Sequence, residues 1–104
     1  MASSDVHQRV HLNVRITGRV QGVSFRATAH QQAEALGLTG FVRNEPDSSV
    51  YAEVEGPREA ALQFAAWCRH GPGEAEVRSC ESVEGPLAGF EHFTVYKGDG
   101  SIAA

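Results

Sequence analysis

The sequence predicts an α+β fold in which two helices cover one face of an antiparallel sheet. Hydrophobic residues recur at every second position in two segments and at helical spacing in two others, with glycines or prolines between them. Three further segments between these breaks also read as strands. The order is strand, helix, strand, strand, helix, strand, and a short final strand. Right-handed crossovers would place the first and third strands in the centre, which predicts a ferredoxin-like α/β sandwich.

The first half of the chain holds the clearest elements. Residues 10–17 alternate between hydrophobic and polar side chains, which predicts a strand with one buried face. Gly18 is expected to open a loop over residues 19–23. A helix then begins at Ser24, which can serve as the N-cap, and stops at Gly37. The inner stripe of this helix is Phe25, Ala29, Ala33 and Leu36.

The second half is predicted to contain a hairpin, a second helix and two weaker strands. A turn over residues 45–49 joins the hairpin strands. The helix has Pro57 in its first turn and ends near residues 70–73. Its inner stripe is Ala61, Phe64, Ala65 and Cys68. The strands are expected at residues 38–44, 50–55, 76–83 and 92–97.

One domain is expected, because 104 residues with 41% hydrophobic content support a single core. The domain would span residues 10–97, with flexible tails at residues 1–9 and 98–104. Two cysteines, Cys68 and Cys80, are too few for a disulfide framework and are expected to be ordinary buried thiols.

The charge and the hydrophobic pattern exclude several classes of partner. A formal net charge of −4 argues against nucleic acid, which usually requires a basic face. No hydrophobic run approaches the roughly 20 residues that span a bilayer. The first residues lack the basic start and apolar stretch of a secretory signal. We therefore expect a cytoplasmic protein with neither a nucleic acid nor a membrane as partner.

The segment GRVQGVSFR, residues 18–26, is the most informative part of the chain. Its glycines allow the backbone to curl around a ligand, and the helix that follows presents unpaired N–H groups at its positive end. Both features favour a bound phosphate. Arg26, in the first turn of that helix, could bind two phosphate oxygens with its planar guanidinium. The alternative is an ordinary glycine turn before a helix with a solvated arginine.

The same segment lacks the features of other phosphate chemistries. It matches neither the Walker loop nor the dinucleotide fingerprint, and Val20 stands where a phosphocysteine loop needs its thiol. Ser24 is the one hydroxyl, and its cap role outweighs a nucleophilic role because no base is adjacent in sequence. Hydrolysis at this site should therefore proceed by direct attack of water.

GRVQGVSFR, together with Asn44 in GFVRNEPDSSV, closely resembles the acylphosphatase family. The resemblance covers roughly residues 10–97 and implies metal-free hydrolysis of an acyl phosphate to a carboxylate and inorganic phosphate, with no cofactor. Arg26 aligns with the family's phosphate-binding arginine, and Asn44 with the asparagine that orients the water. The backbone N–H groups of the loop correspond to the phosphate cradle. With the arginine, the implied phosphate-binding residues are Val20, Gln21, Gly22, Val23, Ser24, Phe25 and Arg26.

The resemblance also implies the partners, which are a small-molecule acyl phosphate and inorganic phosphate, and we expect a monomer. Because the motifs contact chiefly the phosphoryl end, broad tolerance of the acyl group is expected. One departure is visible at Asp47-Ser48, where relatives often carry Asp-Gly. This change can alter the geometry of the turn after Asn44.

The five histidines show no metal-ligand spacing, and His30 is expected to face solvent rather than act as an acid or base. Three alternatives remain open. An RNA-recognition domain shares the element order but needs stacking aromatics, and the third strand offers only Tyr51. A non-catalytic domain could keep the fold. The acylphosphatase portion of hydrogenase-maturation proteins, which acts on carbamoyl phosphate, also resembles this sequence.

Overall fold

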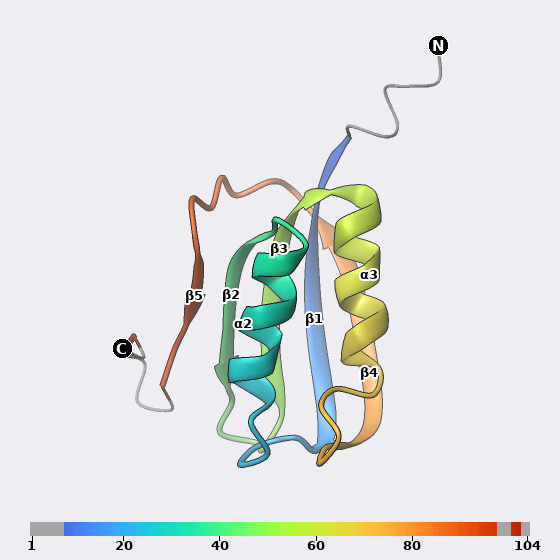
Figure 1. The fold of residues 1–104 in the computed structure, drawn as a ribbon, viewed down its shortest axis with the longest axis vertical. Helices are drawn as coiled ribbons and strands as arrows, with labels where there is room; N and C mark the ends of the chain where they lie inside the picture. The colour runs from blue at the N-terminus through green and yellow to red at the C-terminus, as the bar shows by residue number, and fades with distance from the viewer. Residues whose placement is uncertain (1–7, 98–100, 103–104) are drawn as a thin grey trace.

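A computed structural model describes residues 8–97 and 101–102 and shows the predicted elements in the predicted order (Figure 1). Their bounds are β1 (Arg9–Arg19), α2 (Phe25–Ala35), β2 (Thr39–Asn44), β3 (Val50–Pro57), α3 (Arg58–Cys68), β4 (Glu76–Gly85) and β5 (Phe93–Val95). The ferredoxin-like α+β fold is therefore confirmed.

The strands form one sheet in the order β4-β1-β3-β2-β5, so β1 and β3 occupy central positions as predicted. The pairs among β1, β2, β3 and β4 are antiparallel. β5 pairs parallel with β2, which makes the sheet mixed rather than wholly antiparallel. The reason is topological: β4 ends at the end of the sheet where β2 begins, and the chain crosses over that end to the opposite edge (Figure 1).

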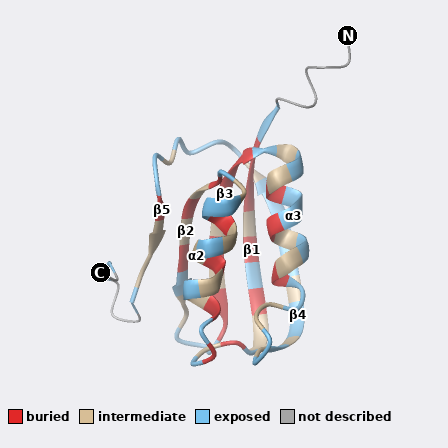
Figure 2. Ribbon diagram, viewed as in Figure 1, coloured by how far each residue is buried: buried red, intermediate tan, exposed pale blue. Residues whose placement is uncertain are grey.

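Both helices cover one face of the sheet, and the hydrophobic core lies between the two layers (Figure 2). The predicted helix stripes are confirmed for most of their members, while Leu36 and Ala65 pack against the core only partly buried. Cys68 is buried as expected, Cys80 is half-buried, and both are free thiols. The buried members of the predicted stripes and of the first strand are Phe25, Ala29, Ala33, Ala61, Phe64, Cys68, Val10, Leu12, Val14 and Ile16.

The first strand runs further than predicted, because Gly18 lies inside β1 instead of opening a loop. The pairing of β1 with β4 shifts register between Thr17 and Gly18. Gly18 has a φ of 122°, and a Cβ there would lie 2.2 Å from the carbonyl oxygen of Glu76. A glycine in sequence reads as a chain break, but here it permits a bulge where two backbones approach closely.

Ser24 occupies the N-cap position of α2, but the predicted side-chain cap is wrong. Its φ is 64°, in the left-handed region, and its side chain makes no cap hydrogen bond. The Ser24 carbonyl still accepts the first helical hydrogen bond, from the Thr28 N–H over 3.0 Å, but the Ser24 side chain caps none of the first-turn N–H groups. The extended backbone of an ordinary N-cap aims the hydroxyl at the helix, and this conformation does not.

The face of the sheet opposite the helices carries a buried ionic cluster that alternation alone did not predict. His11 and Glu55 are 4% and 1% exposed, and His11 Nδ1 lies 2.7 Å from Glu55 Oε2. The Glu55 carboxylate also accepts hydrogen bonds from three consecutive backbone N–H groups, those of Ala88, Gly89 and Phe90. His11 Nε2 lies 2.9 Å from Glu53 Oε1. The chain between β4 and β5 is thereby attached to the sheet.

The predicted tails fall largely outside the described residues, which omit 1–7, 98–100 and 103–104. At the other end of the fold, the Lys97 N–H donates to the Ser101 carbonyl over 2.6 Å, and Ile102 forms an antiparallel bridge with Tyr96. Among the helices of the described chain, none has the length and apolar character needed to cross a bilayer.

Candidate active site

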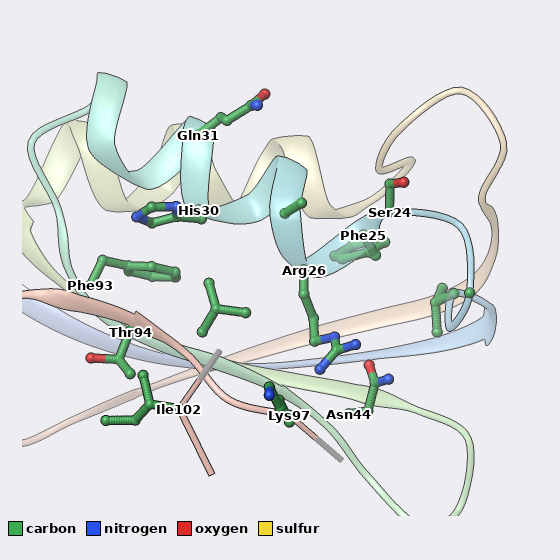
Figure 3. Close-up of a pocket in the computed structure, with 14 residues that line it drawn as sticks. Ser24, Phe25, Arg26, His30, Gln31, Asn44, Phe93, Thr94, Lys97 and Ile102 are labelled. Carbon is green, nitrogen blue, oxygen red and sulfur yellow. The ribbon is translucent and has the colours of Figure 1, made fainter. Parts of the chain in front are cut away.

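A cavity of about 740 Å³ opens between the N-terminal end of α2, the end of β2, and β5 (Figure 3). It brings together Arg26 and Asn44, which come from different elements. Four other residues of the predicted phosphate loop also line it: Val20, Gly22, Ser24 and Phe25. Gln21 and Val23 do not line the cavity. Val23 is buried in the core, and Gln21 points its side chain toward the β2–β3 turn.

The loop between β1 and α2 presents free backbone donors. Within the described residues, no N–H group from Gln21 to Arg26 donates to a main-chain acceptor. Gly22 has a φ of 76°, which a residue with a side chain rarely adopts. Unpaired N–H groups at the positive end of a helix favour a bound anion.

Arg26 extends from the first turn of α2 into the cavity, where its guanidinium is held by main chain. Arg26 Nη1 donates to the Tyr96 carbonyl over 2.6 Å, a contact between residues 70 positions apart. The side chain is half-buried, so part of the guanidinium stays open to the cavity. A guanidinium has five N–H donors, and one such bond orients it without using up its capacity to bind an oxyanion. Sequence patterns give no signal for Tyr96, because its contribution is a backbone carbonyl.

Asn44 is the last residue of β2, and its side chain faces the cavity close to Arg26 (Figure 3). Within the described residues the Asn44 carboxamide has no hydrogen-bond partner. Its neighbour Arg43 extends to the opposite face, where it stacks over the rings of Phe41 and Tyr51 and pairs with Glu45. Arg43 and Asn44 therefore point to opposite faces of the sheet, as neighbours on a strand do.

Gln21 joins the loop between β1 and α2 to the β2–β3 turn. Its Nε2 donates to the carbonyls of Glu45 and Ser49, each over 2.9 Å. Because Asn44 directly precedes this turn, these bonds hold the loop and the Asn44 backbone in one arrangement. The sequence predicts a role in phosphate binding only for the backbone N–H of Gln21, because a local pattern does not show where a long amide side chain reaches.

The remaining cavity residues come from α2, from β5 and from the chain that follows β5. His30 lies on the cavity wall with 41% of its side chain exposed, as expected for a solvent-facing residue, and its ring stacks on Phe93 with centroids 5.8 Å apart. His30 Nε2 also lies 3.3 Å from Glu34 Oε2. In the part of the chain that the structure describes, no three histidine, cysteine or carboxylate side chains gather as metal ligands would.

The fold and the cavity define a class: a small α+β domain whose first strand–helix junction presents unpaired backbone N–H groups and an arginine to a cavity that an asparagine also lines. Comparison with known proteins identifies the family, because the acylphosphatase family model matches residues 12–95. The chain belongs to the acylphosphatase family, whose enzymes hydrolyse acyl phosphates.

Individual relatives agree with this assignment. An acylphosphatase of Nocardioides sp. is 45% identical over 91 residues, covering 88% of this chain and 92% of that protein. The solved acylphosphatase of Coxiella burnetii superposes with a TM-score of 0.82 at 29% identity, covering 91% of this chain and 99% of that one. Full-length HypF, solved in a phosphate- and nucleotide-bound form, superposes with a TM-score of 0.78 at 27% identity over 91% of this chain and 13% of its own.

Proposed function

We propose that this enzyme hydrolyses acyl phosphates by direct attack of water, without a metal ion or cofactor. Arg26 and the backbone N–H groups of residues 20–25 hold the phosphoryl group, and Asn44 orients the water. The observation that carries the proposal is the shared cavity: Arg26 and Asn44 reach it from different elements, beside a loop whose N–H groups are free.

The chemistry of the substrate explains how so few groups are sufficient. A carboxylate leaving group has a pKa of about 4, as in aspartate and glutamate side chains. It therefore departs with the electron pair of the P–O bond and needs no general acid. The water oxygen forms the new bond to phosphorus, and its proton passes to a phosphate oxygen or to solvent. What remains for the protein is to stabilise charge on the equatorial oxygens and to align the water.

The two side chains answer these two needs. Arg26 and the loop N–H groups supply donors to the phosphoryl oxygens in a fixed arrangement, since the Tyr96 carbonyl already orients the guanidinium. The Asn44 carboxamide can accept a hydrogen bond from the water without placing a negative charge beside the phosphate. A carboxylate at this position would repel the substrate.

We propose further that the enzyme acts as a cytoplasmic monomer and binds its product, inorganic phosphate. Light scattering that gave the mass of a single chain would support the monomer, whereas a dimer mass would contradict it.

Hydrolysis of benzoyl phosphate, with and without a chelator, tests the proposed reaction. We expect turnover that is unchanged by EDTA, and competitive inhibition by inorganic phosphate. Loss of turnover on chelation, recovered by adding back a divalent cation, would contradict the metal-free mechanism. Turnover of carbamoyl phosphate that far exceeds turnover of benzoyl phosphate would favour the hydrogenase-maturation alternative.

A further inference from the structure

The cavity extends well beyond the groups that hold the phosphoryl moiety. Its volume of about 740 Å³ lies in the range of small-molecule sites, roughly 300–1,000 Å³, and a phosphoryl group alone would fill only a small part. The remainder runs between α2 and β5 and is called the α2–β5 arm. Its apolar and aromatic lining is Ala27, His30, Phe93, Val95 and Ile102, and the other cavity residues outside the loop are the polar Gln31, Thr94 and Lys97.

The arm lies on the leaving-group side of the proposed phosphate position. Figure 3 shows Asn44 on one side of the Arg26 guanidinium, and His30, Phe93 and Ile102 on the other. In phosphoryl transfer the attacking and leaving oxygens stand roughly in line on opposite sides of phosphorus. A water held by Asn44 therefore directs the departing acyl group into the arm.

Ile102 forms the outer wall of the arm. It is 64% exposed although it is large and apolar, and it borders the cavity. Two contacts hold residues 101–102 beside the cavity. Ile102 forms a β-bridge with Tyr96, and the Lys97 N–H donates to the Ser101 carbonyl. The Tyr96 carbonyl also accepts the hydrogen bond from Arg26, so Tyr96 contacts both Ile102 and the guanidinium.

The inner wall of the arm is formed by aromatic rings. Phe93 is buried against Phe64, and the His30 ring stacks on it with an interplanar angle of 20°. Contact with a ligand in this arm would remove apolar surface of Ile102 from water, which favours binding in proportion to the area covered.

We propose that the α2–β5 arm is the subsite for the acyl group and that Ile102 determines its specificity for large apolar acyl groups. This inference rests on the proposed function and refines the expected tolerance of the acyl group. It predicts that an aromatic acyl phosphate gains contacts that a small one cannot make. Acetyl phosphate, whose acyl group ends one carbon beyond the carbonyl, would not reach Ile102.

The test compares kcat/KM for benzoyl phosphate and acetyl phosphate in the wild type, in Ile102→Ser and in Ala27→Phe. Ala27 is exposed on α2, so the larger side chain fills the arm without entering the core. The kcat/KM of each variant is divided by the wild-type kcat/KM for the same substrate. This ratio cancels the difference in intrinsic reactivity between the two compounds. Val83→Ser is the matched control, because Val83 is equally exposed, at 64%, but lies on β4 outside the cavity.

We expect Ile102→Ser to lower kcat/KM for benzoyl phosphate about 5- to 10-fold, and Ala27→Phe to lower it about tenfold or more. Acetyl phosphate turnover and inhibition by inorganic phosphate should change less than about twofold, as should all values for Val83→Ser. Equal effects on both substrates, or no effect of either variant on benzoyl phosphate, would overturn the subsite. A wild type that hydrolyses neither compound would overturn the proposed function itself.

Discussion

Turnover is expected to depend strongly on the single side chain of Asn44. Its carboxamide is the group of the cavity that we assign to the water, and within the described residues nothing else binds it. We expect Asn44→Ala to lower kcat about 100-fold or more, as removal of one positioned polar group does in other enzymes. The inhibition constant of inorganic phosphate should stay within about threefold of the wild-type value, since the phosphate donors remain.

Asn44→Asp further separates the effect on turnover from the effect on phosphate affinity. A carboxylate would repel the phosphate, so this variant should lose phosphate affinity as well as turnover. Steady-state kinetics with phosphate as inhibitor measure both quantities. Loss of phosphate affinity in Asn44→Ala equal to its loss of turnover would contradict the water-orienting role.

Arg26 is expected to act on binding and turnover together. Arg26→Ala removes the guanidinium that faces the cavity and leaves the Tyr96 carbonyl without its donor. We expect kcat/KM to fall about 1,000-fold and phosphate binding to become undetectable by calorimetry, because charge-assisted bonds to an oxyanion are lost. Arg78→Ala, which removes the same charge from an exposed position on β4, is the control. Retained phosphate binding in Arg26→Ala would refute the assignment.

At the scale of elements, the β2–β3 turn is bonded to the loop between β1 and α2. Gln21 binds two carbonyls of this turn, and the Asp47 carboxylate accepts bonds from the backbone N–H and hydroxyl of Ser49. Ser48 sits at the corner with a φ of 79°, in the left-handed region. The turn thus keeps a glycine-like conformation although the sequence supplies a serine there.

Ser48→Gly should therefore stabilise the protein. A residue with a Cβ costs roughly 1–2 kcal/mol in the left-handed region, and the greater chain entropy of glycine offsets only part of this. We expect the free energy of unfolding to rise by about 0.5–1 kcal/mol and the Tm by about 2–8 °C. Ser82→Gly, at an exposed position of β4 without a positive φ, should lower the Tm instead. A lower Tm for both variants would contradict strain at Ser48.

At the scale of the whole molecule, stability should depend on pH through the His11–Glu55 cluster. Burial alone would lower the pKa of His11, but hydrogen bonds to Glu55 and Asn13 and the charges of Glu53 and Glu55 outweigh it and raise the pKa above 6.5. Burial alone would raise the pKa of Glu55. Hydrogen bonds from the Ala88 backbone, His11 and two further backbone N–H groups outweigh it and lower the pKa below 4.5.

The signs of these shifts set the pH window. The contribution of His11 is fully present below pH 6.5 and is lost as the pH rises through its raised pKa in the folded state. The contribution of Glu55 is present above pH 4.5 and is lost as the pH falls through its lowered pKa. We expect urea unfolding to show greatest stability from this pair between pH 4.5 and 6.5.

His11→Gln should flatten the decline in stability above pH 6.5, since the titrating group is gone while the three backbone bonds to Glu55 remain. His70→Gln, at an exposed position beyond α3, should leave the decline unchanged. Urea titrations at several pH values measure both variants. The same slope in His11→Gln and in the wild type would show that other groups cause it.

The sequence by itself determined the order of elements, the face that each helix buries and the family, and it predicted the loop and the arginine, Arg26, that we propose to bind phosphate. These depend on local patterns, in which hydrophobic spacing and a glycine before a helix act within a few residues. Only the tertiary structure decided what supports the site. The Tyr96 carbonyl accepts a hydrogen bond from Arg26, the Gln21 side chain binds the β2–β3 turn, and Ile102 lines the cavity. Each is a contact between residues distant in sequence, made by a backbone group or a side chain whose partner no local spacing specifies.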